Sequence, residues 1–476
     1  MDPIKNYDEV VANLRRIVTS PSHPYPEELV KKLEKDYLEK NKKSFEMFEE
    51  AKKYIPGGVE HNLSLNHPFP LAVDRVKGCK IWDVDGNEYI DYLMCGAPII
   101  IGHAIDEIDN KVIELIKEKG PASGVTSEYE ILAAKEIVKH MPAVDMVRFF
   151  ASGTEADMAA IRLARVYTDK EKIIKIGGSY HGWSDQLVYS LHIPGTGPLE
   201  ASGIPKSVNQ NTISVPPNHE KKLRRAFEKN QDKGGIAAVI LEPIGGESGT
   251  HPVHPEWNKY VRELCDEYGT LLIFDEVVTG FRLGMGGAQK FFNVMPDLTV
   301  LGKIIGHGYP TCGALGGKKE IMLTASAGIE GIKKKAYTGG TLSANPILTC
   351  ACYHTLKYIE KHNAAEKAAA YADKLTKELN ELYETREDLP FFAYNYKSII
   401  HNETSSFLAI RLTDKDALNQ ITIRRKIAEE YQLACHLKNI HLLQGSRIYT
   451  CMMHDQEALD KTIKAFEYML SLIPKN

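Results

Sequence analysis

Short apolar runs alternate with helix-length segments between about residues 106 and 305. Five runs have the length of a buried strand, at 146–150, 173–176, 237–241, 271–274 and 298–301. Continuous apolar runs of this kind, separated by helical segments, are typical of parallel strands covered on both faces. The pattern therefore predicts an α/β fold, with a mostly parallel sheet sandwiched by helices.

The flanking segments have other patterns. Residues 1–54 predict two polar helices separated by a proline-rich break at 20–26. Residues 81–90 predict a β-hairpin with its turn at 85–87. Long helical segments follow residue 346, such as 364–383 and 455–471, with a few strands between them. This last region predicts a smaller α/β domain.

Composition narrows the class of ligand. The chain of 476 residues is 43% hydrophobic and 26% charged with a net charge of −4, which offers no electrostatic footprint for nucleic acid or an anionic membrane. No apolar run is long enough to cross a bilayer, and the first residues are polar and acidic. The eight cysteines are scattered without zinc-ligand spacing. We expect a cytoplasmic protein with small-molecule ligands, reduced thiols and no metal.

Candidate chemistry follows the predicted strands at their carboxyl ends, where open α/β sheets bind ligands. Ser152, Gly153 and Thr154 follow the first run and open a helix, an arrangement that suits a phosphate group. Tyr180 follows the second run within a glycine-flanked segment, and its ring suits stacking on a flat ligand. The third run is followed by a glycine-rich segment that carries Glu247.

Asp275 and Lys303 follow the fourth and fifth runs. A carboxylate at the end of an apolar strand implies a cationic partner, such as the protonated ring nitrogen of a pyridine cofactor. Each feature alone also fits an ordinary helix cap, core aromatic ring, salt bridge or solvated lysine. Together and in this order they form the set that pyridoxal phosphate needs, with Lys303 as the lysine that holds it in a Schiff base.

These segments resemble the class III (fold type I) pyridoxal-phosphate aminotransferases, and among them the glutamate-1-semialdehyde aminomutase branch. The resemblance runs from about Pro56 to the C-terminus and is most specific at 84–92, 149–165, 237–243, 272–282, 296–305 and 339–346. It implies a large cofactor domain at 76–345 and a C-terminal small domain at 346–476. Residues 1–75 would be an N-terminal arm and part of the small domain.

The resemblance also assigns roles to single residues. It implies that Tyr180 and Val277 pack on the two faces of the cofactor ring, and that Asp275 pairs with the pyridine nitrogen. Thr341 matches the residue that reaches the phosphate from the other subunit, which implies a homodimer with shared active sites. The remaining cofactor residues implied are the phosphate-binding Ser152, Gly153 and Thr154 and the Schiff-base Lys303.

The sequence departs from the aminomutase branch around the substrate. No arginine follows Gly57-Gly58-Val59, where that branch has one that binds carboxylate, and Gly96 and Trp183 replace its tryptophan and histidine. Glu247 stands where the branch has asparagine, as in the ω-aminotransferases, and Arg447 matches their partner arginine. We hypothesise that Glu247 and Arg447 form a switchable pair that binds a substrate carboxylate, with a plain salt bridge as the alternative. Trp183 is the third candidate substrate-binding residue.

These departures favour an aminotransferase that moves an amino group from an amine donor, of ω-amine or β-amino acid type, to a keto-acid acceptor. The alternative is a pyridoxal-phosphate isomerase, either like glutamate-1-semialdehyde 2,1-aminomutase or an amino-acid racemase. A third interpretation, a catalytically silent cofactor-binding or regulatory protein, is disfavoured because both Lys303 and Asp275 are present.

Overall fold

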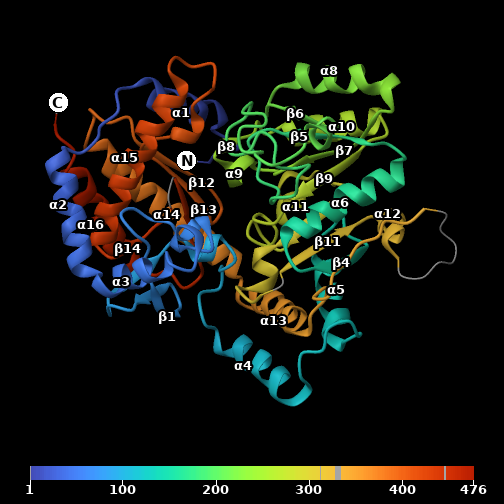
Figure 1. The fold of residues 1–476 in the computed structure, drawn as a ribbon, viewed down its shortest axis with the longest axis horizontal. Helices are drawn as coiled ribbons and strands as arrows, with labels where there is room; N and C mark the ends of the chain where they lie inside the picture. Colours follow the sequence, from blue (N-terminus) through green and yellow to red (C-terminus); the bar gives the residue numbers. More distant parts are fainter. Residues whose placement is uncertain (1, 311, 327–333, 444–445, 476) are drawn as a thin grey trace. The chain divides into compact units, whose positions relative to one another are not determined.

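The computed structural model describes residues 2–310, 312–326, 334–443 and 446–475. The chain divides into two units, which are described separately (Figure 1). The central unit is Asp106–Ala365. The terminal unit joins both ends of the chain, Met1–Ile105 and Glu366–Asn476.

A seven-stranded sheet forms the core of the central unit, with the strand order β4-β11-β10-β9-β7-β5-β6. Its strands are β4 (Met146–Phe150), β5 (Lys172–Ile176), β6 (Thr212–Val215), β7 (Ile236–Leu241), β9 (Leu271–Asp275), β10 (Leu298–Gly302) and β11 (Gly313–Gly317). The pairs from β10 to β6 are parallel, and β11 runs antiparallel to β10 and β4. The predicted α/β fold with a mostly parallel sheet is confirmed, and the five predicted strands match within one residue at each end.

Helices cover both faces of this sheet, as Figure 1 shows. Strand β9 illustrates how: Ile273 packs into a cluster with α6 (Gly153–Thr168), whereas its neighbours Leu272 and Phe274 pack with α8 (Glu220–Asn230) and α10 (Trp257–Glu267). Alternate residues of a strand point to opposite faces, so a strand that is apolar throughout is buried on both. All five residues of β9 are buried, which explains its unbroken apolar run.

The other elements of the central unit are shorter or lie beside the sheet. Helix α13 (Pro346–His362) packs against α5 (Glu128–His140), α4 (Asp106–Glu114) and the turn Lys303–Gly306 that follows β10. A π-helical turn at Leu115–Lys119 extends α4. The short elements are α7 (Lys206–Asn209), α9 (Gly246–Gly249), β8 (His251–Pro252), α11 (Gly287–Phe292) and α12 (Lys319–Met322).

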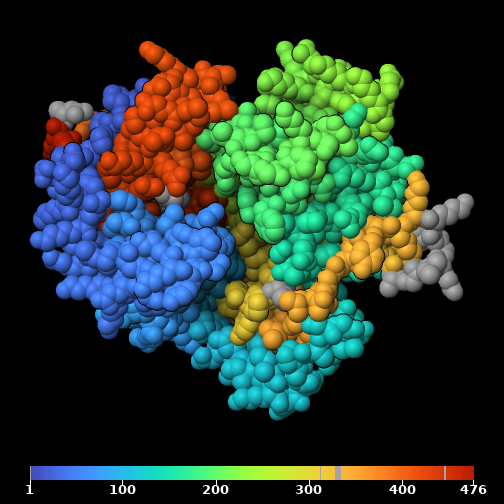
Figure 2. Space-filling model, viewed as in Figure 1, coloured from blue at the N-terminus to red at the C-terminus, as the bar shows by residue number. Residues whose placement is uncertain are grey.

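The terminal unit begins with three helices where two were predicted: α1 (Tyr7–Thr19), α2 (Glu27–Lys40) and α3 (Lys42–Ala51). The outer side of α2 is exposed (blue in Figure 2). The second predicted helix is broken at the buried Asn41, which has the non-helical angles φ −126° and ψ 46°. Its side chain donates to the Tyr37 carbonyl (3.0 Å) and accepts from the Tyr89 hydroxyl (2.9 Å), so tertiary hydrogen bonds favour the break.

Two sheets and three long helices complete the terminal unit. The predicted hairpin is confirmed, because β2 (Lys80–Asp83) pairs antiparallel with β3 (Glu88–Asp91). This sheet continues with β1 (Val73–Lys77) on one side and β14 (Ile440–His441) on the other. The second sheet contains β12 (Phe392–Tyr396), β13 (Ile399–Glu403) and β15 (Arg447–Tyr449). The long helices are α14 (Ala364–Glu384), α15 (Ala417–Leu437) and α16 (Gln456–Ser471).

The division into units lies 20 to 30 residues away from the domain boundaries proposed from the sequence, at 105/106 and 365/366 instead of 75/76 and 345/346. Residues 76–105 belong to the terminal unit because β2 and β3 share a sheet with β14. Residues 346–365 belong to the central unit because α13 packs on α4 and α5. The assignment of these segments to functional domains remains a proposal.

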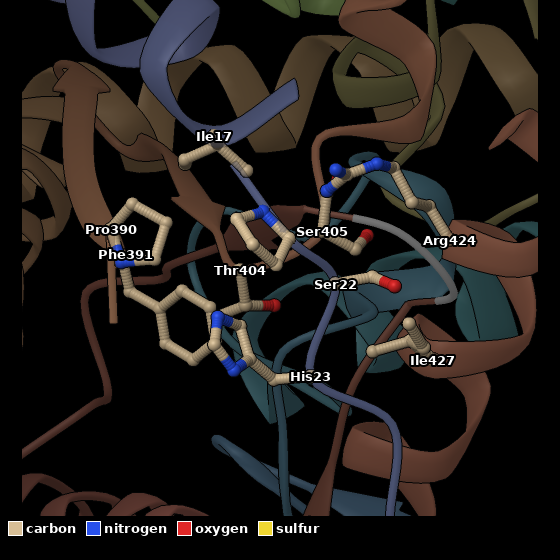
Figure 3. Close-up of a pocket in the computed structure, with 10 residues that line it drawn as sticks. Ile17, Ser22, His23, Pro390, Phe391, Thr404, Ser405, Arg424 and Ile427 are labelled. Atoms are coloured by element: carbon tan, nitrogen blue, oxygen red, sulfur yellow. The ribbon is translucent and has the colours of Figure 1, made fainter. Parts of the chain in front are cut away.

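A small cavity lies within the terminal unit, beside His23, Phe391 and Arg424 (Figure 3). Its volume is about 10 Å³, which holds no more than about one water molecule. This cavity is therefore too small for a substrate. Among the described residues, none of the helices is both long and apolar enough to cross a membrane.

Candidate active site

Asp275 and Lys303 leave the sheet from neighbouring strands. Strands β9 and β10 are parallel and adjacent, and Val300 pairs with Asp275 in their register. Lys303 directly follows the end of β10. The structure therefore brings the predicted carboxylate and the predicted lysine to the same edge of the sheet, as the sequence pattern indicated.

Asp275 is buried, and both of its carboxylate oxygens are engaged. Oδ2 lies 2.7 Å from Nδ1 of His181, and Oδ1 accepts a hydrogen bond from the backbone N–H of Val277 (2.9 Å). Burial lowers the pKa of His181, although the hydrogen bond to Asp275 opposes this shift. A neutral imidazole that donates its Nδ1–H to the carboxylate oxygen Oδ2 satisfies this geometry.

A second buried carboxyl group, Asp157 on α6, belongs to the same cluster. One polar side-chain atom from each of Asp157, His181 and Asp275 lies within 4.8 Å of the other two. Burial, followed by the charge of Asp275, raises the pKa of Asp157 well above its usual range. Two carboxyl groups this close do not both ionise easily, which disfavours the charged form of Asp157. No role was predicted from the sequence for His181 or Asp157.

The phosphate-binding segment predicted at Ser152–Thr154 forms the N-terminus of α6. Ser152 is the N-cap, and its hydroxyl accepts from the backbone N–H of Glu155 (3.2 Å). A Cβ atom on Gly182 would lie only 2.1 Å from Thr154 Oγ1, so glycine is required where the Tyr180 loop meets this helix. The N-terminus of this 16-residue helix offers backbone N–H groups and a favourable dipole to an anion.

Val277 lies between two glycines of the predicted site. A Cβ atom on Gly153 would approach Val277 Cγ2 to 3.0 Å, and one on Gly302 would approach Cγ1 to 3.1 Å. Val277 thus connects the helix N-terminus with the end of β10. Lys303 itself has φ 46°, in the left-handed region, and non-glycine residues held in that conformation cluster at functional sites.

Glu242 connects two loops, one that carries Tyr180 and one that carries Glu247. Its carboxyl oxygens accept from the backbone N–H groups of Tyr180 (2.9 Å), Glu247 (3.0 Å) and Ser248 (2.8 Å). Burial raises the pKa of Glu242 to about 8. The sequence pattern placed this residue on a glycine-rich strand end but gave no signal for these contacts, which join two loops that are far apart in the chain.

The three predicted substrate-binding residues are placed differently. Glu247 is buried in the central unit, and its Oε1 contacts Nδ1 of His192, whose ring stacks on Tyr180 with 6.1 Å between centroids. Trp183 is 77% exposed in the same unit. Arg447 lies on β15 of the terminal unit. The pairing of Glu247 with Arg447 stays a prediction, and His192 is an additional candidate near Glu247.

The donor set fits pyridoxal phosphate. The buried carboxyl group of Asp275 suits the ring nitrogen, the N-terminus of α6 suits the phosphate, and Lys303 supplies an amine at the adjacent strand end. Tyr180 keeps 44% of its surface exposed, so its ring is available to a planar group. Thr341 is also exposed, in a turn of the central unit. The individual roles of these residues remain predictions.

Comparison with known proteins defines the class. A sequence model of the family Aminotransferase class-III matches residues 63–390, so the chain belongs to this family of pyridoxal-phosphate enzymes. The fold is fold type I, and the cofactor is pyridoxal phosphate.

Individual relatives narrow the comparison. The chain is 40% identical over 435 residues to the glutamate-1-semialdehyde 2,1-aminomutase of Methanocaldococcus jannaschii. The alignment covers 89% of this chain and 97% of that protein. It resembles the crystal structure of an ω-transaminase from Sphaerobacter thermophilus, with a TM-score of 0.77 and 27% identity over 90% of this chain and 97% of that one. A glutamate-1-semialdehyde aminomutase from Pseudomonas aeruginosa PAO1 shares the fold, with a TM-score of 0.80 and 19% identity over 94% and 98% of the two chains.

These similarities confirm the enzyme class and cofactor expected from the sequence. They do not single out an aminotransferase, because the reported relative at 40% identity is named an aminomutase. Between the two activities left open by the sequence, they favour the isomerase.

Proposed function

We propose that the chain is a pyridoxal-phosphate-dependent isomerase of the aminomutase type, which moves an amino group between neighbouring carbons of one small substrate. The observation that carries this proposal is the 40% identity to an aminomutase across 97% of that protein's length. Fold similarity alone does not distinguish the reactions, because a transaminase and an aminomutase match the structure about equally well, with TM-scores of 0.77 and 0.80.

The residues of the cluster suit this reaction. When bound, pyridoxal phosphate supplies an electron-accepting ring that stabilises negative charge on the substrate carbon. Lys303 Nζ holds the cofactor and then accepts and returns the substrate proton. Asp275 maintains the proton on the ring nitrogen, and His181 orients Asp275 through the 2.7 Å hydrogen bond. The N-terminus of α6, at Ser152, anchors the phosphate.

We further propose that the active enzyme is a homodimer with shared sites. Thr341 is exposed in the described chain, in keeping with a contact to the cofactor phosphate of a second subunit. The dimer would exclude water from each site. It would also keep the substrate inside the site until the amino group has moved to the neighbouring carbon.

Aminotransfer from an amine donor to a keto acid is the second candidate. It is favoured by the absence of an arginine after Gly57-Gly58-Val59 and by Glu247 in place of asparagine. Glu247 is buried and contacts His192. The two ionisable side chains therefore lie together at Glu247, the position proposed to bind substrate in an aminotransferase.

One experiment separates the two activities. The holoenzyme is incubated with glutamate-1-semialdehyde alone, and in parallel with an ω-amine in the presence and absence of pyruvate or 2-oxoglutarate. An isomerase converts the first substrate without an acceptor, whereas an aminotransferase turns over only when an acceptor is added. Repeated turnover that depends strictly on a keto acid would overturn the isomerase proposal. The Lys303→Ala variant is the control for reaction without the enzyme.

A further inference from the structure

A cluster of metal-ligating side chains lies away from the Asp275 site, where α5 packs against α13. Glu136 and His140 lie four residues apart on α5, so they point to the same side of that helix, and Glu360 lies on α13. One donor atom from each of the three lies within 4.8 Å of the other two. No metal was expected from the sequence, which lacks zinc-ligand spacing. Residues separated by more than 200 positions, as Glu136 and Glu360 are, do not form a recognisable ligand motif.

Two atoms of this cluster are buried without a hydrogen bond. They are Nε2 of His140 and Oε2 of Glu136, and the side chains that carry them are only 10% and 12% exposed. Leaving a buried polar atom without a hydrogen bond is costly, so both atoms would gain from a shared partner, although Lys139 Nζ already lies 3.7 Å from Oε2 of Glu136. The two atoms lie 3.4 Å apart, and His140 Nε2 lies 3.7 Å from Oε2 of Glu360.

These separations match the spacing of ligands around a tetrahedral zinc ion. Two donors at the usual zinc distance of about 2.0–2.1 Å, separated by a tetrahedral angle, lie about 3.4 Å from each other. We propose that Glu136, His140 and Glu360 form a binding site for a divalent transition metal, best suited to zinc, with water in the remaining position. An imidazole with two carboxylates is a donor set that zinc accepts.

The surrounding charges favour a cation at this place. Glu136 and His140 lie in the last turns of α5 and Glu360 lies in the last turn of α13, so two helix C-termini direct their negative dipole ends toward the site.

Two lysines compete with a metal for the carboxylates. Lys139 Nζ lies 2.8 Å from Oε1 and 2.9 Å from Oε2 of Glu360, and Lys357 Nζ lies 3.8 Å from Oε1 of Glu136. Both lysine side chains are about half exposed, at 48% and 47%, so each can move into solvent when a divalent ion binds. Exposed ion pairs of this kind contribute little to stability, and their loss costs little.

The test is calorimetric titration of ZnCl₂ into the holoenzyme after treatment with a chelator. We expect one zinc ion per chain at this site and a higher melting temperature with zinc. His140→Gln and Glu360→Gln should each weaken binding by about tenfold or more, since loss of even an outer-sphere partner costs about 10- to 100-fold. His354→Gln is the matched control, because His354 lies on the same helix as Glu360 and its Nε2 already contacts the Tyr129 hydroxyl (3.3 Å), so this variant should bind zinc as the wild type does.

Lys139→Gln gives an expectation of the opposite sign. It retains all three ligands and removes one of the two competing lysine charges, so zinc should bind more tightly. The proposal is overturned if no zinc binds, or if His140→Gln and Glu360→Gln bind it as tightly as the wild type. Glu360 is 39% exposed, so its variant should fold normally even if a change at His140 disturbs the packing of α5.

Discussion

His181 Nδ1 and Asp275 Oδ2 lie 2.7 Å apart in the interior of the central unit. Neither residue is a neighbour of the other in sequence, since His181 follows β5 and Asp275 ends β9. The hydrogen bond fixes the orientation of the one carboxylate that the sequence pattern assigned to the cofactor nitrogen. It makes His181 a positioning residue whose effect should be measurable even without the cofactor.

Replacing His181 with alanine should destabilise the apoprotein. The change removes a hydrogen bond to a buried charged group and leaves an oxygen of Asp275 without its donor, which costs about 1.5–3 kcal/mol of unfolding free energy. Urea unfolding of the apoprotein measures this cost. Trp183→Ala, in the same loop but 77% exposed, is the control and should change stability by no more than about 0.5 kcal/mol. Equal stabilities of His181→Ala and wild type would contradict a positioning role.

The raised pKa of Glu242, about 8 in the folded protein, predicts a pH-dependent component of stability. Between about pH 4.5 and 8 the folded state holds a proton that the unfolded state has released. The unfolding free energy contributed by Glu242 is therefore present at low pH and falls as pH rises through this window, by up to about 1.4 kcal/mol per pH unit.

Glu242→Gln tests that component in the apoprotein. The variant loses one acceptor for a backbone N–H group, so it should be less stable by a constant offset of about 1–3 kcal/mol. The unfolding free energy of the wild type minus that of the variant should fall from pH 5 to pH 8, because only the wild type has the titrating Glu242. Asp275 and Glu247, whose charges help to raise the pKa of Glu242, are present in both proteins. A difference that stays constant with pH would show that Glu242 is ionised in the fold.

The strands that could be predicted from the sequence are those made of continuous apolar residues. Strand β11 was missed because its sequence is Gly-Ala-Leu-Gly-Gly, which has little intrinsic preference for a strand. Its glycines are explained only by the packed structure: a Cβ atom on Gly313 would lie 2.1 Å from the carbonyl oxygen of Ser152. Strand β6 is short and lies at the edge of the sheet, so its apolar pattern is weak.

The candidate active site, like the sheet, could be predicted only in part. Asp275 and Lys303 follow apolar strands, and the parallel order of strands brings such residues to one edge. His181, Asp157 and Glu242 carry no comparable signal, because their roles depend on hydrogen bonds and burial between segments that are distant in sequence. A buried polar residue is informative only once its partners are known.

Lys303 should be the residue that holds the cofactor. Reduction of the holoenzyme with borohydride should fix pyridoxal phosphate to the peptide that contains Lys303, as detected by mass spectrometry. Lys303→Ala should retain the fold and lose turnover by several orders of magnitude, because both the attachment and the proton carrier are removed. Lys318, which is paired with Asp297, is the matched control, and Lys318→Ala should keep its cofactor. Cofactor found on another lysine would contradict the assignment.

Arg447→Ala should affect carboxylate substrates selectively. If Arg447 binds a substrate carboxylate, its loss should raise KM for amino or keto acids by about 10- to 100-fold and leave simple amines unchanged. Steady-state kinetics with a matched pair of substrates, with and without a carboxylate, measures the difference. Glu247→Gln should have a smaller effect in the same assay, because it removes the partner and not the binding group. Equal effects of Arg447→Ala on both substrates would support a plain structural salt bridge.

Thr341 should act on the site of the partner subunit. The Thr341→Glu variant places a negative charge where the phosphate is expected and should bind the cofactor poorly, while Lys303→Ala is inactive for a different reason. In a mixed dimer, the site that uses Lys303 from the first variant receives an intact Thr341 from the second. Unfolding and refolding the two variants together should therefore restore about a quarter of wild-type activity, since half the dimers are mixed and each has one intact site. If Thr341 served its own subunit, neither site of a mixed dimer would be intact and no activity would return. The recovery of activity thus distinguishes a shared site from a self-contained one.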